Sequence, residues 1–415
     1  MSFAVVPKNI RSSFYFLPDL ILWMAIASLV GVVAGSASAL FLTALDFVTA
    51  TRLQNPWLLY LLPLAGLGIA WLYHRYGKSV EGGNTLLIEE IHNPQKVIPL
   101  RMTPLILLGT LVTHLFGGSA GREGTAVQMG GSLADQLTVL FRLSQEKRKI
   151  LLMTGISAGF ASVFGTPLAG ALFGLEVLFV GRLRYQALLP CFTAAIVADR
   201  VCLAWGIHHT PYAISFVPPF TTINIIGAAI AGIAFGLCAA LFSFSMHRLT
   251  HTLKKLFKSP FIRVFCGGAM IVGLSVLLKT DRYLGLGIPV IQETFLGPVP
   301  AYDFALKIIF TIITLSAGFK GGEVTPLFFI GATLGNALAW LLPLPSSLLA
   351  GMGFVAVFAG AANTPLTCVI MAVEIFGTGP GIYTAIACIM SYLFSGHRGI
   401  YHSQKIEVFK YAQKD

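Results

Sequence analysis

Long apolar segments, separated by short polar breaks, run through the whole chain. A helix needs about 20 apolar residues to cross a bilayer, and some of these segments are long enough for two passes or one steeply tilted helix. Only 11% of the 415 residues are charged, against roughly 25% in a soluble domain. The sequence therefore predicts an all-α polytopic membrane protein in a lipid bilayer. The segments are residues 20–45, 57–73, 102–116, 150–180, 222–244, 264–278, 308–319, 343–375 and 382–394.

The basic residues gather in the polar breaks. The formal net charge is +11, which could indicate nucleic-acid binding, but short basic loops between apolar segments are typical of the cytoplasmic side of a membrane protein. We therefore expect both termini in the cytoplasm and no nucleic-acid partner. The basic residues on which this expectation rests are Lys8, Arg11, Arg142, Lys147, Arg148, Lys149, Arg182, Arg184, Arg248, Lys254, Lys255, Lys258, Lys405, Lys410 and Lys414.

Metal and cofactor motifs are not expected in this chain. The six cysteines lie in or beside apolar stretches without C-x-x-C spacing, which indicates membrane packing and neither disulfides nor metal ligands. The stretch EEIHN, residues 89–93, reads as a polar loop because His92 has no HExxH partner. His114, alone in an apolar helix, reads as a hydrogen-bonded core histidine.

The chain contains an internal repeat. ASVFGTPLAGALFGLEV, starting at Ala161, corresponds to AGAANTPLTCVIMAVEI, starting at Ala359, at a constant offset of 198 positions (359 − 161). Two homologous halves are thus expected, residues 1–207 and 220–415, joined by a loop at 208–219. Such repeats are typical of transporters with a site near mid-membrane. Hydropathy alone leaves open whether the halves are inverted.

Each half has a glycine-rich break that contains a carboxylate. GGSAGREGTAVQ includes Arg122 and Glu123, and AGFKGGEVTPLFF includes Lys320 and Glu323. Helix N-termini at such breaks bind anions through free N–H groups, and an ionised side chain at this depth is functional by default. A mobile carboxylate there would act as a tethered anion and leave when protonated. The alternative is a capping carboxylate paired with the neighbouring cation.

These motifs resemble those of the CLC family of chloride channels and proton-coupled anion antiporters. GREG followed by TAVQ is similar to the family's G-R-E-G-P, GGEVTP to G-G-x-F-x-P, GIYHSQ to the start of the helix with the central tyrosine, and GTPLAGALFGLEV to N-x-P-L-x-G-x-x-F-x-x-E-E. The resemblance implies a CLC-type fold of two inverted-topology halves, a homodimer with one pore per subunit, and Glu123 as the external gate. We expect no cystathionine-synthase-like regulatory domain.

Four departures resemble the fluoride-exporting branch of the family. Asn84 in GGNTL replaces the central serine, and Thr125 replaces the proline of the gating motif. Glu323 begins a Glu-Val-Thr sequence where the family has a phenylalanine motif. Val177 stands where chloride antiporters have their internal proton-transfer glutamate.

Fluoride is strongly hydrated, so its site needs short, strong donors. Asn84 offers an amide, Thr325 a hydroxyl and Tyr401 a phenol. Each has a structural alternative: Asn84 as a helix cap, Thr325 bonded to its own backbone, Tyr401 in an interfacial belt. Glu176 and Glu374, which are repeat partners, are expected to bond broken backbone. The candidate anion-binding residues are Asn84, Gly121, Arg122, Gly124, Val324, Thr325 and Tyr401, and the gating and proton residues are Glu123 and Glu323.

The resemblance and the residues together predict a fluoride/proton antiporter of the bacterial inner membrane. It would export cytoplasmic fluoride at the expense of the inward proton gradient, without covalent chemistry. A chloride/proton antiporter and a passive anion channel of the same fold are the alternatives. A membrane-embedded enzyme would need a nucleophile, metal or phosphate motif, and we find none in the sequence.

Overall fold

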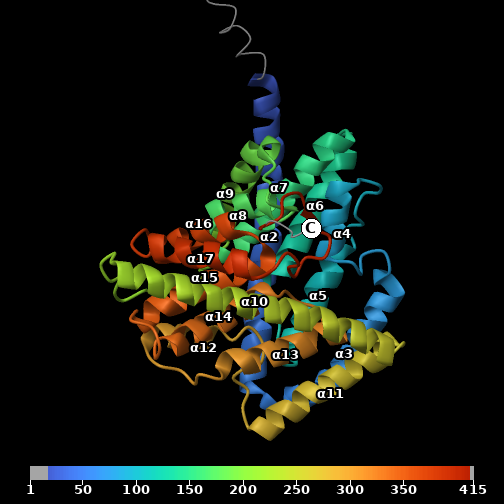
Figure 1. Cartoon of the computed structure of the whole chain (residues 1–415). Coiled ribbons are helices and arrows are strands. Elements are labelled where there is room, and N and C mark those ends of the chain that lie inside the picture. Colours follow the sequence, from blue (N-terminus) through green and yellow to red (C-terminus); the bar gives the residue numbers. More distant parts are fainter. Residues whose placement is uncertain (1–16, 412–415) are drawn as a thin grey trace, which may run out of the picture.

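The computed structural model describes residues 17–411, which form a helical protein with one short two-stranded sheet (Figure 1). The first half of the chain contains the elements α2 to α9, and the second contains α10 to α17. The α-helices are α2 (Leu17–Gln54), α3 (Leu62–Leu72), α4 (Asn84–His92), α5 (Met102–Leu115), α6 (Glu123–Leu140), α7 (Gln145–Phe164), α8 (Pro167–Glu176), α9 (Leu188–Ala204), α10 (Thr222–Leu256), α11 (Pro260–Leu278), α12 (Ile288–Leu296), α13 (Asp303–Ala317), α14 (Val324–Leu338), α15 (Ser346–Ala362), α16 (Pro365–Phe376) and α17 (Gly381–Phe394). The remaining elements are η1 (Pro56–Leu61), η2 (Tyr73–Gly77), η3 (Tyr185–Ala187), β1 (Phe179–Val180) and β2 (Lys405–Ile406).

Five helical segments of the described chain are long and apolar enough to cross a membrane. They are Leu17–Gln54, Pro56–Gly77, Tyr185–Ala204, Thr222–Leu256 and Pro260–Leu278. Their outer faces expose large apolar side chains such as Phe47 and Leu277, at 71% and 77%, which indicates contact with lipid because soluble proteins rarely expose such surfaces. The chain is thus a multi-pass membrane protein, as predicted.

The two longest apolar stretches each fold into two helices. Residues 150–180 break between α7 and α8 at Gly165, where φ is +69°, and residues 343–375 break between α15 and α16 at Asn363, where φ is +57°. In both halves a Thr-Pro pair follows, and the proline begins the next helix, a position that suits proline because its missing N–H would have no helical partner. The sequence left two passes and one tilted helix open, and the structure has two helices in each case.

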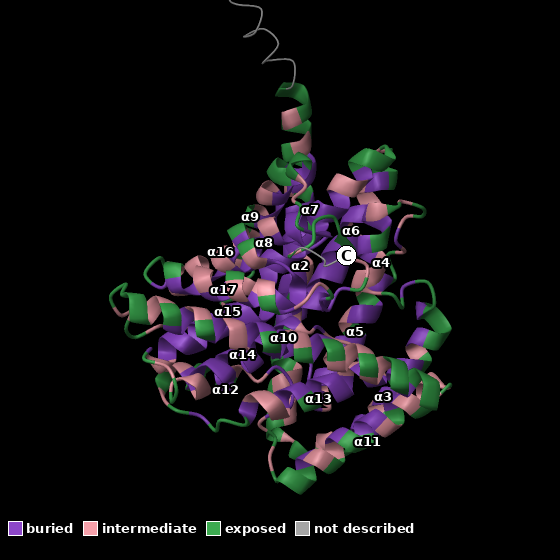
Figure 2. Ribbon diagram, in the orientation of Figure 1, coloured by how far each residue is buried: buried purple, intermediate pink, exposed green. Residues whose placement is uncertain are grey.

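The inner helices of the two halves cross closely at glycines. A Cβ on Gly130 of α6 would collide with the backbone oxygen of Gly155 in α7, and a Cβ on Gly331 of α14 would collide with that of Gly353 in α15. Gly155 and Gly353 are 198 positions apart (353 − 155), the offset of the repeat. Small residues permit this approach between membrane helices, and these helices form the buried interior seen in purple in Figure 2.

Corresponding helices of the two halves run antiparallel. The carboxylate of Glu176, at the end of α8, accepts hydrogen bonds from the first turn of α16, at Leu366 N (3.0 Å) and Thr367 N (2.8 Å). Glu374, near the end of α16, accepts from the first turn of α8, at Leu168 N and Ala169 N (both 2.8 Å). This reciprocal contact confirms that the halves are inverted, and that these carboxylates satisfy the backbone of broken helices.

The chain that follows α17 returns to the first half. β2 pairs in parallel with β1, and the Ser403 hydroxyl donates to Glu89 of α4 at 2.9 Å. In Figure 1 this C-terminal segment lies in front of α4 and α6. It therefore places Tyr401 beside helices of both halves.

Candidate anion and proton site

The two glycine-rich breaks meet at the centre of the molecule, where α6 and α14 begin. Gly121 and Gly322 form an antiparallel bridge: the N–H of Gly121 donates to the Gly322 oxygen at 2.6 Å, and the N–H of Gly322 donates back at 2.8 Å. Positive φ angles at Gly321 (+153°) and Gly117 (+84°) require glycine. Two helix N-termini therefore face one small region, as the sequence predicted. The N–H of Gly121, a candidate anion donor, is occupied by this bridge.

Threonines from the opposite half hold each break. The backbone N–H of Ser119, in the first break, donates to the Thr314 hydroxyl of α13 at 3.2 Å, and the Ser119 hydroxyl lies 3.0 Å from that of Thr311. The backbone N–H of Lys320, in the second break, donates to the Thr113 hydroxyl of α5 at 3.2 Å. These contacts satisfy non-helical backbone that the bilayer cannot solvate.

A buried hydrogen-bond network joins the first break and the start of α6 to α5. The ring nitrogens of His114 lie 2.9 Å from the Thr110 oxygen and 3.1 Å from the Ala120 oxygen, which confirms the predicted core histidine. The Thr110 hydroxyl lies 2.6 Å from that of Thr125. The threonine that replaces the family's proline is thus anchored to α5.

The carboxylate of Glu123 binds the start of the other half's helix. It is fully buried, and it accepts hydrogen bonds from the Thr325 N–H (3.1 Å), the Thr325 hydroxyl and the Arg122 N–H (3.0 Å). The Arg122 guanidinium is 3.9 Å away. The carboxyl group of Glu123 thus occupies the N-terminus of α14. Thr325 bonds this carboxylate, so the alternative in which it only bonds its own backbone is wrong.

A cavity of about 210 Å³ lies on one side of Glu123. We call it the basic-side cavity, because its α10 wall precedes Lys254 and Lys255 in the last turn of that helix. Tyr401, buried at 9% exposure, lines it and is therefore not an interfacial belt residue. Its polar lining includes Glu81, Asn84, Gln128, His247, Thr250, Lys320, Glu323, Tyr401 and His402.

A second, smaller cavity of about 40 Å³ lies on the other side. We call it the aromatic cavity because Phe164, Phe328 and Phe354 line it, with the last two stacked at 4.0 Å between ring centroids. Arg122 and Thr325, the two residues whose backbone N–H groups bind Glu123, also line it. Gly321 and Glu323 line the basic-side cavity. The Glu123 carboxylate therefore lies between the two cavities.

Asn84 points toward the start of α6. It is the first residue of α4, its side chain makes no cap hydrogen bond, and Gly83 with φ +56° is the N-cap. A Cβ on Gly124 would lie 3.2 Å from Asn84 Nδ2. The buried Oδ1 has no hydrogen-bond partner within residues 17–411. The helix-cap alternative is therefore wrong, and the amide N–H groups face the region of the two helix N-termini.

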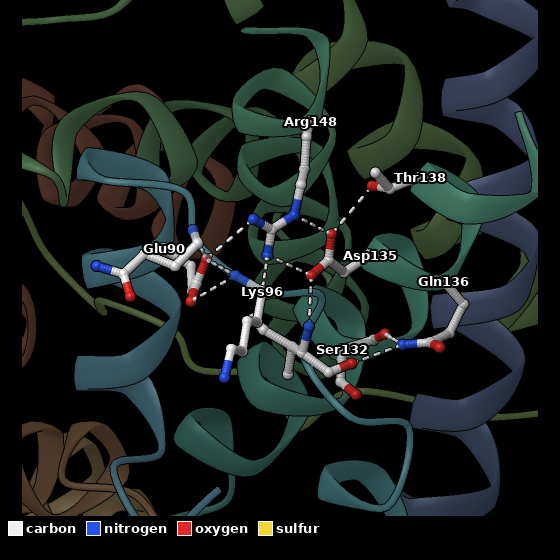
Figure 3. Close-up of polar contacts among 9 residues, drawn as sticks. Glu90, Lys96, Ser132, Asp135, Gln136, Thr138 and Arg148 are labelled. Atoms are coloured by element: carbon white, nitrogen blue, oxygen red, sulfur yellow. Dashed lines mark hydrogen bonds and ion pairs between the residues drawn. The ribbon is translucent and has the colours of Figure 1, made fainter. Parts of the chain in front are cut away.

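A buried ion network fixes the helix that carries Asn84 (Figure 3). Arg148 of α7 donates to Asp135 of α6 at 2.7 and 2.8 Å, and to Glu90 of α4 at 2.9 Å. Asp135 also accepts the N–H of Ile98 at 2.8 Å, and Glu90 accepts that of Gln95 at 2.8 Å. The network is fully paired, as a buried charge requires.

This network corrects one prediction. The stretch 89–93 was expected to be a polar loop, but residues up to His92 belong to α4. Glu90 is buried because Arg148 reaches it from a segment 58 positions later. A local sequence window contains no signal for such a partner.

The structure places Lys320 against an aromatic ring and buries Val177. No ion pair joins Lys320 to Glu323 among the described residues; the Lys320 Nζ lies 3.9 Å above the Tyr73 ring centroid. Val177 is buried at 2% exposure, next to the end of α8. Sequence reasoning missed Tyr73 and His247, neither of which belongs to a recognisable motif. The prediction of Arg148 as a residue of a basic loop was wrong, because its side chain is buried in α7.

The fold and the paired helix breaks define an anion transport protein built from inverted repeats, and comparisons with known proteins give its family. Residues 65–396 match the voltage-gated chloride channel family, so the chain belongs to the CLC family. A Pseudomonas syringae pv. tomato protein named "Chloride/fluoride channel protein" is 56% identical over 94% of this chain and 88% of its own length. A crystal structure titled as a CLC-type fluoride/proton antiporter is 36% identical, covers 94% of this chain and 98% of its own, and has a TM-score of 0.91. A slow cyanobacterial Cl⁻/H⁺ antiporter, 20% identical over 91% of this chain and 96% of its own with a TM-score of 0.80, shares the fold.

Proposed function

We propose that this protein is a fluoride/proton antiporter that exports cytoplasmic fluoride and uses the inward proton gradient. The observation that carries the proposal is the position of the Glu123 carboxylate, which lies between two cavities and accepts hydrogen bonds from Arg122 and from the N-terminus of α14. In the proposed mechanism it closes the path between them as a tethered anion. Protonation removes the charge that these donors bind, so a proton on Glu123 frees the position for fluoride. The similarity of this chain to a chloride/fluoride channel protein and to a fluoride/proton antiporter supports the proposal.

The donors around the path favour fluoride over chloride. A small anion recovers lost hydration through short, strong hydrogen bonds, and the Thr325 hydroxyl and the Asn84 amide offer them from the two halves. Our assignment has Asn84, Gly121, Arg122, Gly124, Val324, Thr325 and Tyr401 as the anion path. Gly121 belongs to it as part of the backbone wall, because its N–H is bonded to Gly322. Glu123 is the gate, and Glu323, in the wall of the basic-side cavity, is the second proton carrier.

The proposal extends to the orientation of the protein in the membrane and to its oligomeric state. The basic-side cavity faces the cytoplasm, because positive residues concentrate on the cytoplasmic side of membrane proteins. Both termini face that side, and the protein is a homodimer in a bacterial inner membrane with one path per subunit. The two repeats are residues 1–207 and 220–415, as expected from the sequence, with 208–219 as the connection between them. The protein performs no enzymatic chemistry.

Transport by purified protein in liposomes tests this function. With a fluoride gradient, the wild type should release fluoride and take up protons together, and chloride should be a poorer substrate. Glu123→Gln should abolish the proton movement, because the amide can neither carry the proton nor act as a tethered anion. Glu146→Gln is the matched control, since that carboxylate is exposed at the start of α7 and, within residues 17–411, pairs with Lys149 alone. Fluoride efflux by the wild type without protons would indicate a channel, and coupled exchange in Glu123→Gln would remove the gate assignment.

A further inference from the structure

The proposed antiport requires a route for protons between Glu123 and the cytoplasm. Val177 cannot carry a proton, and it is buried beside the end of α8. The proton route therefore has to use the groups that line the basic-side cavity. Among its titratable groups, two are histidines, whose ordinary pKa of about 6.5 lies closest to the pH of a cytoplasm.

These two histidines, His247 of α10 and His402, are in direct contact. Their ring centroids are 3.9 Å apart with an interplanar angle of 32°. His402 directly follows Tyr401 in the chain, and both histidines share the cavity wall with Glu323 and Tyr401. The pair thus lines the same cavity as Glu323, the candidate proton carrier of the second half.

Exposure falls from one histidine to the other. His402 is exposed and His247 is half-buried, and the buried Nε2 of His247 has no hydrogen-bond partner within the described chain. A buried polar atom left without a partner is costly, so this nitrogen has a hydrogen-bonding position still to fill. The pair therefore extends from solvent, at His402, to a less accessible part of the cavity wall, at His247.

The charges around the pair keep it from holding two protons. Two imidazolium rings at this separation would repel each other strongly, and partial burial, with the positive charges of Lys254 and Arg398, lowers the pKa of His402 below its ordinary value. The pair is then neutral at rest and accepts a single proton in passing. The other charged or titratable groups of the cavity wall are Tyr73, Glu81, Lys320, Glu323 and Tyr401.

We infer that His247 and His402 form the proton exchange point between the basic-side cavity and the cytoplasm. In fluoride export, the proton leaves the Glu323 carboxylic acid for cavity water, binds a neutral imidazole nitrogen of the pair, and departs from His402 to bulk water. Each histidine returns to its neutral form, so no charge accumulates over a cycle. The inference rests on the proposed function, since only a proton-coupled transporter needs such an exit.

The test uses full-length protein in liposomes, with fluoride efflux and proton uptake measured from pH 5.5 to 8. In the double variant H247Q/H402Q, proton movement should fall at least about tenfold, the low side of what positioned proton-transfer groups contribute. The dependence of the proton rate on pH should weaken, while fluoride-over-chloride selectivity should stay at the wild-type value. His251→Gln is the matched control, because that histidine is exposed one turn further along α10.

The single variant H402Q guards against a folding defect, because it changes an exposed side chain. Its proton movement should also fall, and free imidazole in the buffer should restore part of it, which a purely structural role would not allow. If both variants keep wild-type proton movement and the wild-type pH profile, the inference is wrong while the antiport function stands. If the wild type itself moves fluoride without protons, the proposed function and the inference fail together.

Discussion

The reciprocal caps between α8 and α16 allow a sharp prediction about folding. Glu176→Gln changes a buried carboxylate that accepts three hydrogen bonds, from Leu366 N at 3.0 Å, Thr367 N at 2.8 Å and the Thr367 hydroxyl at 2.7 Å. The new amide nitrogen is a donor that faces donors, so at least one of these bonds is lost. It also removes a negative charge from the N-terminus of α16.

The magnitude follows from these contacts. A hydrogen bond to a charged group is worth about 1.5–3 kcal/mol, and a charge at a helix terminus contributes up to about 2 kcal/mol in a partly buried site. We expect Glu176→Gln to destabilise the folded protein by about 2–4 kcal/mol. Glu374→Gln should cost less, about 1–2 kcal/mol, because that carboxylate is half-buried and accepts two bonds.

Thermal stability in detergent measures the difference. The fraction of monodisperse protein after heating, followed by size-exclusion chromatography, should give midpoints in the order wild type, Glu374→Gln, Glu176→Gln. Protein of each variant that remains folded should still exchange fluoride for protons in liposomes. The reasoning is refuted if Glu176→Gln melts with the wild type, or if either variant is stable but inactive, because the carboxylate would then act in transport.

Three further changes address the site and its support. Asn84→Ala removes an amide donor and enlarges the site, so fluoride-over-chloride selectivity in liposomes should fall about ten- to a hundredfold; an unchanged ratio would place selectivity in Thr325 and the aromatic lining. Glu323→Gln should cut coupled turnover severely while the melting midpoint stays near that of the wild type, and full turnover would contradict its role as proton carrier. Arg148→Ala leaves Asp135 buried without its cation, which should cost about 3–5 kcal/mol in stability; a normal midpoint in the same heating assay would show that the network is not needed.

The long apolar segments predicted the lipid-facing helices but did not include α6, an inner helix whose start was marked only by its glycine-rich break. α6 has polar side chains at Gln128, Ser132 and Asp135, so it does not read as a membrane segment. All three are buried against protein, and a helix surrounded by other helices need not be apolar throughout. Hydropathy reports contact with lipid, and it therefore detects the outside of such a fold better than its centre.

The carboxylates of the site could be predicted because they stand out from their apolar surroundings. Glu123 and Glu323 stand in glycine-rich breaks within apolar sequence, where a charge needs a purpose. The contact between His247 and His402 joins residues 155 positions apart (402 − 247), and no local pattern marks either of them. Hydropathy likewise left the inversion of the halves open, although the family resemblance implied it, and contacts such as that between Glu176 and the start of α16 show it directly.

The return of the chain after α17 has a consequence for biosynthesis. Tyr401 and His402 reach the cavity only after every helix of both halves has left the ribosome, since they follow α17. A partly made chain already inserted in the membrane thus lacks one wall of the conduction path. This wall forms last, when the segment docks on β1 and α4, so ion movement begins only once the segment is in place. Mutations that weaken the docking should therefore first produce protein that is inserted in the membrane but inactive in transport.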